Sequence, residues 1–317
     1  MCARRFSYFA RSLRCKNLNI IGIPEKSLNG YYVTGFCDGE ASFSIPFQKN
    51  LKSTLGWSTR AVFQIGVHER DRIILELIKQ YFGVGEIFKQ DKNAYQYRVT
   101  SVKDLINVII PHFSNYPLIT QKLIDFELFK QAVYLLNDKK HLTQEGLLEL
   151  ISIKSVINLG LSDRLKLAFP NFKPIVRPSS LNKKIMDPNW LVGFIEAEGC
   201  FPILIGNSKT KVGKHVQLVF KITQHIRDKE LLISFIDFLG CGRYRVRTNG
   251  LSGDFIVVAY SDKAKKIIPL LNNFQFYGVK NKKYLNFCKV AELIKNKAHL
   301  TVEGLELINK IKIDNKE

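Results

Sequence analysis

The chain has 317 residues, 46% of them apolar, and its 48 lysines and arginines exceed its 28 aspartates and glutamates to give a net charge of +20. This composition excludes a chain that is disordered throughout, and no apolar run approaches the roughly 20 residues that a membrane-spanning helix needs. The excess positive charge favours a polyanionic partner, foremost nucleic acid, over general solubility or attraction to an anionic membrane. The six cysteines show no zinc-binding spacing, so we expect unpaired thiols in a reducing compartment.

The first 24 residues form a basic N-terminal extension that is rich in arginine and serine and contains no acidic residue. This composition is typical of a mitochondrial presequence, and it predicts a mitochondrial location. A disordered basic arm and sequence inherited from an upstream coding region are the alternatives. We therefore assign residues 1–24 to an extension that precedes the folded part of the chain.

The rest of the chain contains the same pattern twice, offset by about 158 residues. YFGVGEIF (81–88) matches FLGCGRYR (238–245), and KKHLTQEGLLELISIK (139–154) matches KAHLTVEGLELINKIK (297–312). A period of this size indicates one duplicated domain and excludes a solenoid. The duplication predicts a pseudo-dimer within a single polypeptide.

The duplication divides the chain into a first repeat (25–158), a linker (159–187) and a second repeat (188–317). The stretch FPNFKPIVRPSSLNKKIMDPN, 21 residues at the junction of linker and second repeat, contains four prolines. Proline removes a backbone donor and restricts the residue before it. We therefore predict an extended connection between the repeats.

Both repeats show the same order of predicted elements. Each begins with an apolar helix that ends in acidic residues. In the first repeat we predict a helix at about 29–40, strands at 42–48 and 57–67, a helix at 70–81, strands at 84–90 and 94–99, and closing helices. In the second repeat we predict a helix at about 188–198, strands at 200–206 and 214–224, a helix at 227–239, strands at 242–247 and 254–260, and closing helices. This order predicts an α+β fold, a pseudo-twofold tandem repeat of α-β-β-α-β-β-α units.

The two apolar helices, within GYYVTGFCDGE and NWLVGFIEAE, are predicted to pack against each other. A helix that is apolar nearly all round must be buried, and each of these contains a glycine, which costs about 1 kcal/mol relative to alanine. Gly35 and Gly193 are explained if the two helix backbones approach closely at a shared interface. A helix contact within one half is the alternative. Parallel packing would bring Glu40 and Glu198 together at one end of the interface.

Glu40 and Glu198 form the candidate catalytic pair, because two close carboxylates repel each other unless a cation lies between them. Hard oxygen ligands with open positions suit Mg²⁺, which completes its shell with water and phosphate oxygens. Beside a basic surface, this arrangement predicts hydrolysis of phosphodiester bonds by in-line displacement. Asp38 and Glu196 lie two residues earlier, on nearly the opposite side of each helix, so they cannot share that site.

The segments VTGFCDGEA and LVGFIEAEG resemble the two signature motifs of the LAGLIDADG homing endonucleases in their single-chain form. The resemblance covers roughly residues 27–315, and LVFKITQHIRDK, LGCG, GVK and the repeated HLT-EGL are similar to the branch encoded in fungal mitochondrial introns. It implies a DNA-binding saddle of antiparallel β-sheets with the two motif helices at the central interface. It also implies a monomer that cuts across the minor groove and leaves a double-strand break with short 3′ overhangs.

The resemblance implies that Glu40 and Glu198 bind the metal, together with the backbone at Ala41 and Gly199. Mg²⁺ or Mn²⁺ would support cleavage, and Ca²⁺ would bind without supporting it. The family has glycine at the last motif position, as in Gly199, whereas the first repeat has Ala41. If that position needs a left-handed turn or lets a carbonyl reach the metal, the first half-site is distorted and the two strands are cut unequally.

Gln224 and Lys280 match family positions that support the water network around the metals, so the resemblance implies a catalytic role for both. The first repeat has Val67 and Thr120 at what we take to be the equivalent positions. This difference between the repeats predicts no definite consequence by itself.

Two further pairs of residues occupy matching positions in the two repeats, and we expect neither pair to take part in catalysis. Asp38 and Glu196 occupy an acidic position to which the resemblance gives a structural, helix-capping or packing role. His68 and His225 lie at strand-to-helix junctions, and we favour capping or packing over catalysis for both.

Alternate side chains of the predicted strands form polar rows that would face DNA. In GRYRVRT, three arginines point the same way, which indicates an anion above them; a solvated edge is the alternative. A two-stranded ribbon fits the major groove, where arginine pairs with guanine and glutamine with adenine. The predicted DNA-binding residues are Ser42, Ser44, Gln48, Arg60, Gln64, Arg98, His215, Gln217, Lys221, Arg243, Arg245 and Arg247.

The sequence therefore predicts a monomeric, Mg²⁺-dependent, site-specific endonuclease that cuts both strands of a long double-stranded DNA target. One alternative is a maturase that binds intron RNA, which Ala41 leaves open. The other is a cleavage-inactive DNA-binding protein on the same scaffold. Retention of both Glu40 and Glu198 argues against it, because a buried carboxylate pair is costly to keep without a metal.

Overall fold

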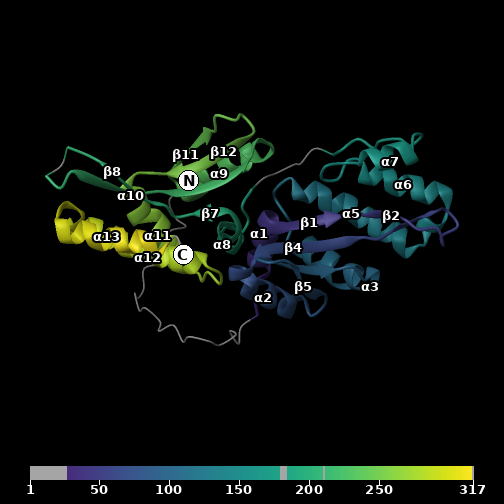
Figure 1. The fold of residues 1–317 in the computed structure, drawn as a ribbon, viewed down its shortest axis with the longest axis horizontal. Helices are drawn as coiled ribbons and strands as arrows, with labels where there is room; N and C mark the ends of the chain where they lie inside the picture. Colours follow the sequence, from purple (N-terminus) through teal and green to yellow (C-terminus); the bar gives the residue numbers. More distant parts are fainter. Residues whose placement is uncertain (1–26, 179–183, 210, 316–317) are drawn as a thin grey trace, which may run out of the picture.

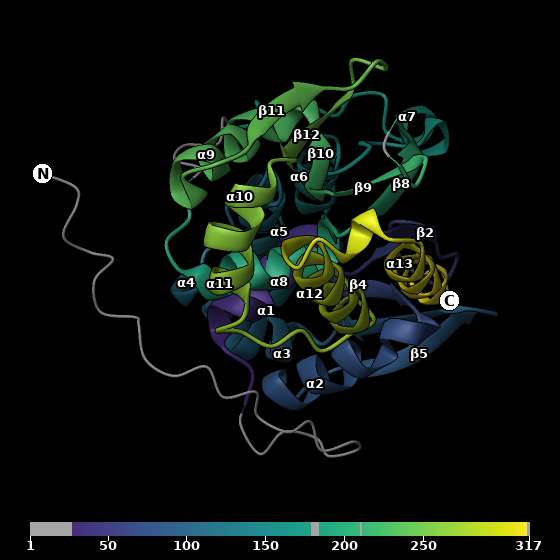
Figure 2. The ribbon, with the colours of Figure 1, turned by 90° about the vertical axis from the view of Figure 1, so that its left-hand side faces the viewer.

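The computed structural model describes residues 27–178, 184–209 and 211–315. Figures 1 and 2 show two similar halves; in Figure 1 the first lies on the right and the second on the left, with α1 and α8 between them. The extension predicted at residues 1–24 lies outside the described residues. Within the described ranges, no helix is long and apolar enough to cross a membrane.

Apart from α7, which has no counterpart in the second half, the same elements occur in the same order in both halves, and this confirms the predicted tandem repeat. The first half contains α1 (Gly30–Glu40), β1 (Ala41–Ser44), β2 (Phe47–Lys49), β3 (Trp57–Thr59), β4 (Val62–His68), η1 (Glu69–Asp71), α2 (Arg72–Phe82), β5 (Glu86–Asp91), β6 (Ala94–Val99), α3 (Val102–Asp104), η2 (Leu105–Ile109), α4 (Ile110–Asn115), α5 (Lys122–Asn137), η3 (Lys140–Leu142), α6 (Gln144–Lys154) and α7 (Asp163–Ala168). The second contains α8 (Pro188–Glu198), β7 (Gly199–Cys200), β8 (Ile203–Asn207), β9 (Lys214–Leu218), β10 (Phe220–His225), η4 (Ile226–Asp228), α9 (Lys229–Leu239), β11 (Arg243–Val246), β12 (Ser252–Val257), α10 (Tyr260–Asp262), η5 (Lys263–Ile267), α11 (Ile268–Leu271), α12 (Lys280–Lys295), η6 (Ala298–Leu300) and α13 (Val302–Asp314).

Each half is built around a four-stranded antiparallel sheet. The strand orders are β1-β4-β6-β5 in the first half and β11-β12-β10-β7 in the second, so that each strand has a counterpart in the other half. A separate two-stranded hairpin, β2-β3 or β8-β9, continues from each sheet. The predicted α+β class and antiparallel sheets are confirmed.

The long strands predicted after each motif helix are interrupted. The predicted strand 42–48 splits into β1 and β2 at Pro46, and the predicted strand 200–206 splits at Pro202. Proline has no N–H for the ladder, so a strand breaks or bends there. The partner strands predicted at 57–67 and 214–224 are also split, and each half therefore has a sheet plus a hairpin.

The two motif helices pack directly against each other at their glycines. A Cβ at Gly35 would lie 1.9 Å from the Trp190 carbonyl oxygen, and one at Gly193 would lie 2.0 Å from the Tyr32 carbonyl oxygen. Only glycine permits backbones to approach so closely. The predicted shared interface is confirmed, and the alternative of separate contacts within each half is excluded.

Aromatic side chains fill the core beneath each sheet. Phe43 of β1 contacts four other phenylalanines, Phe63, Phe113, Phe126 and Phe129. In the second half, Phe201 follows β7 and contacts Phe220, Phe276, Tyr284 and Phe287. Because side chains alternate along a strand, Phe43 in the core directs its neighbours Ser42 and Ser44 to the opposite face.

The connection between the halves begins later than predicted. Leu161, Leu165 and Phe169, which we assigned to the linker, pack with Leu147 and Ile151 of α6 in a small second core. The helix α7 therefore belongs to the first half, because its apolar residues cover α6. From 170 to 178 the described chain contains no helix or strand, in agreement with an extended connection.

His112 on α4 is a buried histidine that should make stability depend on pH. Its ring nitrogens lie 3.1 Å from the Thr34 hydroxyl and 3.1 Å from the Tyr81 hydroxyl, and burial lowers its pKa to about 3. The unfolded state, with a histidine pKa of about 6.5, binds the proton more tightly, so stability is full above pH 6.5 and falls on acidification.

Lowering the pH from 7 to 5 should cost about 2 kcal/mol of unfolding free energy through His112. We expect urea unfolding at the two pH values to show a loss larger by that amount in the wild type than in His112→Gln. The comparison cancels the titration of all other groups. Equal losses in the two proteins would contradict the prediction.

Candidate active site

The C-terminal ends of α1 and α8 bring the two predicted metal-binding acids together. A Cβ on Gly39 would lie 2.2 Å from the Ala197 Cβ and 3.2 Å from the Glu198 Cγ, so the last turns of the helices touch. Burial, and then the charge of Glu198, raise the pKa of Glu40. The structure thus places Glu40 and Glu198 at the bottom of the interface, close enough to influence each other.

The carboxylate pair fits a hard divalent cation. Two like charges brought close together in a partly buried site repel each other and are stabilised by a positive ion between them. In the described parts of the chain, no three or more His, Cys, Asp or Glu side chains gather into a metal cluster. The protein therefore offers two carboxylates and leaves further positions to backbone carbonyls, water or phosphate, which suits Mg²⁺.

Ala41 and Gly199 follow the two acids and have nearly the same backbone conformation. Ala41 has φ −79° and ψ 159°, and Gly199 has φ −71° and ψ 150°. Neither lies in the left-handed region, so this position does not need a left-handed turn, and that reason for expecting a distorted first half-site is removed. The repeats differ instead at the residue four positions earlier, where Ile195 takes the place of Cys37.

Gly199 has no room for a side chain while Ile195 is present. A Cβ at Gly199 would lie 2.5 Å from the Ile195 Cγ2 methyl group. Gly199→Ala should therefore lower the free energy of unfolding by about 1–3 kcal/mol through overpacking. Adding Ile195→Cys, which copies the first repeat, should recover part of that loss, measured by chemical denaturation. Strictly additive effects of the two substitutions would contradict this explanation.

Two lysines lie under the ends of the motif helices. Lys280 Nζ donates to backbone carbonyls in the last turn of α8, and Lys122 Nζ does the same in α1. Positive charge is favourable at a helix C-terminus. Lys122 lies 158 residues before Lys280, so it is the true counterpart of Lys280, and our choice of Thr120 was wrong.

Lys122 could have been found from the sequence, because TQK in the first repeat matches GVK in the second. Burial lowers the pKa of both lysines, and nearby carboxylates, Asp38 for Lys122 and Glu196 for Lys280, oppose that shift. Each lysine therefore lies in a poorly solvated place, beside an acid of its own half.

Two pockets flank the interface, and each combines residues from both halves. One, of about 270 Å³, is lined by Lys122 of the first half and Gln224 of the second. The other, of about 420 Å³, is lined by Lys280 of the second half together with Glu40 and Val67 of the first. Gln224 and Lys280, which we grouped in the second half-site, therefore line different pockets.

Asp38 and Glu196 accept hydrogen bonds from the loops that precede α5 and α12, and they are not part of the carboxylate pair. Asp38 accepts the Trp190 indole N–H at 2.7 Å and two backbone N–H groups before α5. Glu196 accepts the Tyr32 hydroxyl at 3.2 Å and two backbone N–H groups before α12. Burial raises the pKa of Glu196 to about 7. These contacts agree with the structural role that the sequence suggested.

The predicted DNA-binding residues lie on the sheets and hairpins of both halves. Ser42, Gln64 and Arg98 are directly paired across β1, β4 and β6. Lys221 of β10 and Arg243 of β11 both pair with Ile256 of β12. The other predicted residues outside the arginine row are Ser44 on β1, Gln48 on β2, Arg60 between β3 and β4, and His215 and Gln217 on β9.

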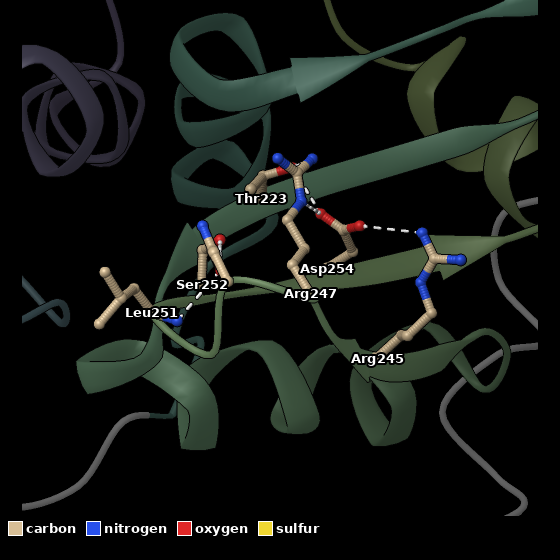
Figure 3. A network of polar contacts seen from close by, with 7 residues as sticks. Thr223, Arg245, Arg247, Leu251, Ser252 and Asp254 are labelled. Atoms are coloured by element: carbon tan, nitrogen blue, oxygen red, sulfur yellow. Dashed lines mark hydrogen bonds and ion pairs between the residues drawn. The ribbon is translucent and has the colours of Figure 1, made fainter.

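The arginine row, which consists of Arg243 and Arg245 on β11 and Arg247 directly after it, has a counter-charge that the sequence reasoning missed. Figure 3 shows the buried Asp254 of β12 between Arg245 and Arg247, with ion-pair distances of 3.4 Å and 2.8 Å. Thr223 donates to the same carboxylate at 2.7 Å. Repulsion among the three arginines therefore does not by itself require an external anion; Asp254 instead fixes two of them.

His68 and His225 cap the short helices that follow β4 and β10. The Nδ1 atom of each accepts the backbone N–H two residues later, from Arg70 and Arg227, at 3.2 Å in both cases. This geometry fits capping, the role we favoured over catalysis. The four cysteines of the described residues are free thiols.

Comparison with known proteins finds a family and close structural relatives. The profile of the family described as LAGLIDADG endonuclease matches residues 33–133 and again residues 191–291. Two relatives from Neurospora crassa, probable intron-encoded endonucleases 3 and 2, are 38% and 39% identical over 89% and 90% of this chain. The chain spans only 53% and 64% of their lengths.

Among solved structures, I-SmaMI bound to its uncleaved DNA target with calcium ions superposes with a TM-score of 0.88. It is 42% identical, and the match covers 90% of this chain and 98% of I-SmaMI. I-SmaMI has also been solved as a LAGLIDADG homing endonuclease bound to cleaved DNA. The match therefore extends over both halves together, in the same relative arrangement.

Proposed function

Because this chain belongs to the LAGLIDADG endonuclease family, we propose that it is a site-specific endonuclease that cuts both strands of a long double-stranded DNA target. The observation that carries the proposal is the meeting of Glu40 and Glu198 at the end of the helix interface, between two sheets with polar and basic faces. The similarity to I-SmaMI, solved with uncleaved and with cleaved DNA, supports it.

In the proposed reaction, Glu40 and Glu198 hold the divalent ion, with Mg²⁺ as the expected species and Mn²⁺ as a substitute. The bound metal would activate water and stabilise the leaving oxygen. Ala41 and Gly199 place backbone carbonyls next to the acids. We infer that Ca²⁺ occupies the same place without supporting cleavage.

The remaining residues of the site orient the phosphate and the attacking water. Lys122 and Lys280 bring positive charge to the two pockets, where it favours the negative charge that develops on the phosphate. Gln224 adds an amide donor and acceptor beside Lys122, whereas Val67 gives the other pocket an apolar wall. We therefore expect the two centres to differ in rate.

The sheets would read the DNA through their polar rows. Lys221 and Arg243 lie in one row on either side of Ile256, and Ser42, Gln64 and Arg98 form the corresponding row in the first half. Such side chains can pair with base edges in the major groove. Lysines outside the rows would contact phosphates and set the position of the protein along the duplex.

We infer that the protein acts as a monomer and belongs to a mitochondrial intron. Two similar halves in one chain supply both carboxylates, so no second copy is needed for two cuts. The Neurospora crassa relatives are named as intron-encoded endonucleases. The extended backbone at Ala41 supports an intact first half-site and so favours the endonuclease over an RNA-binding maturase that has lost cleavage.

Incubation of a randomised double-stranded DNA library with the protein and Mg²⁺, followed by sequencing of the cut ends, tests the proposed function. We expect one long site to be enriched, with staggered breaks on the two strands. Parallel reactions with Ca²⁺, with a chelator and with RNA of the same sequences are the controls. Binding without any cut in Mg²⁺ or Mn²⁺ would overturn the proposal.

A further inference from the structure

Each active-site lysine begins a helix whose N-terminus is held by carboxylates from both halves. Before α12, Glu196 of the second half accepts two backbone N–H groups. Asp71 of the first half accepts the next one, from Val279, at 2.8 Å. Val279 is the N-cap residue of α12, and Lys280 follows it directly. An acid of the opposite half thus binds the backbone immediately before the lysine.

The same arrangement occurs with the halves exchanged. Asp38 of the first half accepts two backbone N–H groups before α5. Asp228 of the second half accepts the Gln121 N–H at 3.0 Å, and the Gln121 side chain also reaches the Arg227 carbonyl. Gln121 is the N-cap residue of α5, and Lys122 is its first residue. The repetition shows that the crossed contact belongs to the architecture of the interface.

Asp71 and Asp228 are well placed to fix the positions of the two lysines. A helix N-terminus has unpaired N–H groups and a partial positive charge, and both favour a carboxylate there. Asp71 and Asp228 end the short helices η1 and η4, which follow directly from β4 and β10 of the DNA-facing sheets. Each aspartate therefore connects the end of one sheet to the lysine of the other half.

Gly278 shows how closely the carboxylates converge on the loop before α12. A Cβ there would lie 2.2 Å from Asp71 Oδ1 and 3.2 Å from Glu196 Oε1. No side chain fits between the two acids without displacing one of them. In the first half, Thr120 occupies the corresponding position, and its hydroxyl donates to Asp38 at 2.6 Å.

We propose that Asp71 and Asp228 are crossed positioning residues: Asp71 sets the position of Lys280, and Asp228 sets the position of Lys122. Each active centre is then complete only when the opposite half is docked. Neither aspartate touches the reacting phosphate in this proposal, which rests on the endonuclease function proposed above. A contact that merely packs the halves together is the competing explanation.

Strand-resolved cleavage separates the two explanations. With a target labelled on each strand, Asp71→Ala should slow one cut by about 10- to 100-fold, the cost typical of losing a residue that orients an active group. It should be the same strand that Lys280→Met slows, and the other strand should change less than about threefold. Asp228→Ala should slow the opposite strand, as Lys122→Met does. Glu69→Ala, which removes an exposed charge from the same turn, is the matched control.

Double substitutions make the test sharper. Asp71→Ala should have no further effect on its strand in the Lys280→Met protein, but it should retain its full effect in the Lys122→Met protein. DNA affinity in Ca²⁺ should stay near the wild-type value throughout. Equal slowing of both strands by Asp71→Ala, or an additive effect with Lys280→Met, would overturn the proposal in favour of simple packing.

Amide hydrogen exchange tests the contact without relying on cleavage. Asp71→Ala should speed exchange at the N-terminus of α12 and leave the N-terminus of α5 unchanged, and Asp228→Ala should do the reverse. Unchanged exchange at both helices would overturn the proposal even if the wild type cuts DNA. If the wild type cuts no DNA but exchange responds as expected, the proposed endonuclease function is wrong, whereas the positioning of Lys280 by Asp71 and of Lys122 by Asp228 is supported.

Discussion

Glu40→Gln and Glu198→Gln should each abolish the double-strand break, with a rate loss on the order of 10³-fold or more. Glutamine keeps the shape of the side chain but removes the charge that would hold the metal. Cleavage of the mapped target in Mg²⁺ is the measurement, with DNA affinity in Ca²⁺ recorded for each protein. Affinity should fall far less than the cleavage rate, because in the proposed complex the sheets, and not the carboxylates, would make most of the contacts with DNA.

The same substitutions should change stability in the opposite direction from activity. Burial and Glu198 raise the pKa of Glu40, so the charged pair is unfavourable when no cation is present. Glu40→Gln should therefore melt at or above the wild-type temperature in a chelator, and it should gain less stability than the wild type from added Mg²⁺. Full cleavage by either variant would contradict the assignment, and Glu69→Gln is the neutral control.

Gly35→Ala and Gly193→Ala should each destabilise the protein by about 1–3 kcal/mol or more. A single added methyl group would lie 1.9 Å from the Trp190 carbonyl oxygen or 2.0 Å from the Tyr32 carbonyl oxygen. Because these neighbours are backbone atoms of the opposite helix, they cannot move aside without separating α1 from α8. Thermal and urea unfolding give the measurement.

Gly66→Ala is the matched control for the two interface glycines, since a Cβ at Gly66 would meet no atom within 4 Å. It should leave the free energy of unfolding within about 0.5 kcal/mol of the wild type. Cleavage by Gly35→Ala should fall together with its stability, because both active centres depend on the docking of the halves. Wild-type stability in Gly35→Ala would show that the helices do not approach as described.

The duplication and the motif helices could be predicted from the sequence because they depend on local patterns. The apolar stretch, the buried glycine and the final glutamate recur at one spacing, and the helix bounds Gly30–Glu40 and Pro188–Glu198 agree with the predicted ranges. The strand interruptions were missed although Pro46 was visible. The alternation of polar and apolar residues continues across the proline, although the backbone hydrogen bonds of the strand are interrupted there.

Contacts that cross between the halves could not be predicted in the same way. The placement of Gln224 beside Lys122 depends on how the two repeats dock, which no spacing within one repeat determines. Asp71 and Asp228 were visible in the matched segments VHERD and QHIRD, but their backbone partners lie in the opposite half. Asp254 was missed because strand register decides which acid lies beneath Arg245.

The measurement that tests the central claim most directly is anomalous scattering from Mn²⁺ in crystals of the protein bound to its target DNA. We predict manganese peaks beside the carboxylates of Glu40 and Glu198, next to the phosphates that are cut, and the loss of such density in Glu40→Gln. Bound DNA with manganese elsewhere, or cut strands whose phosphates lie away from these two glutamates, would contradict the account.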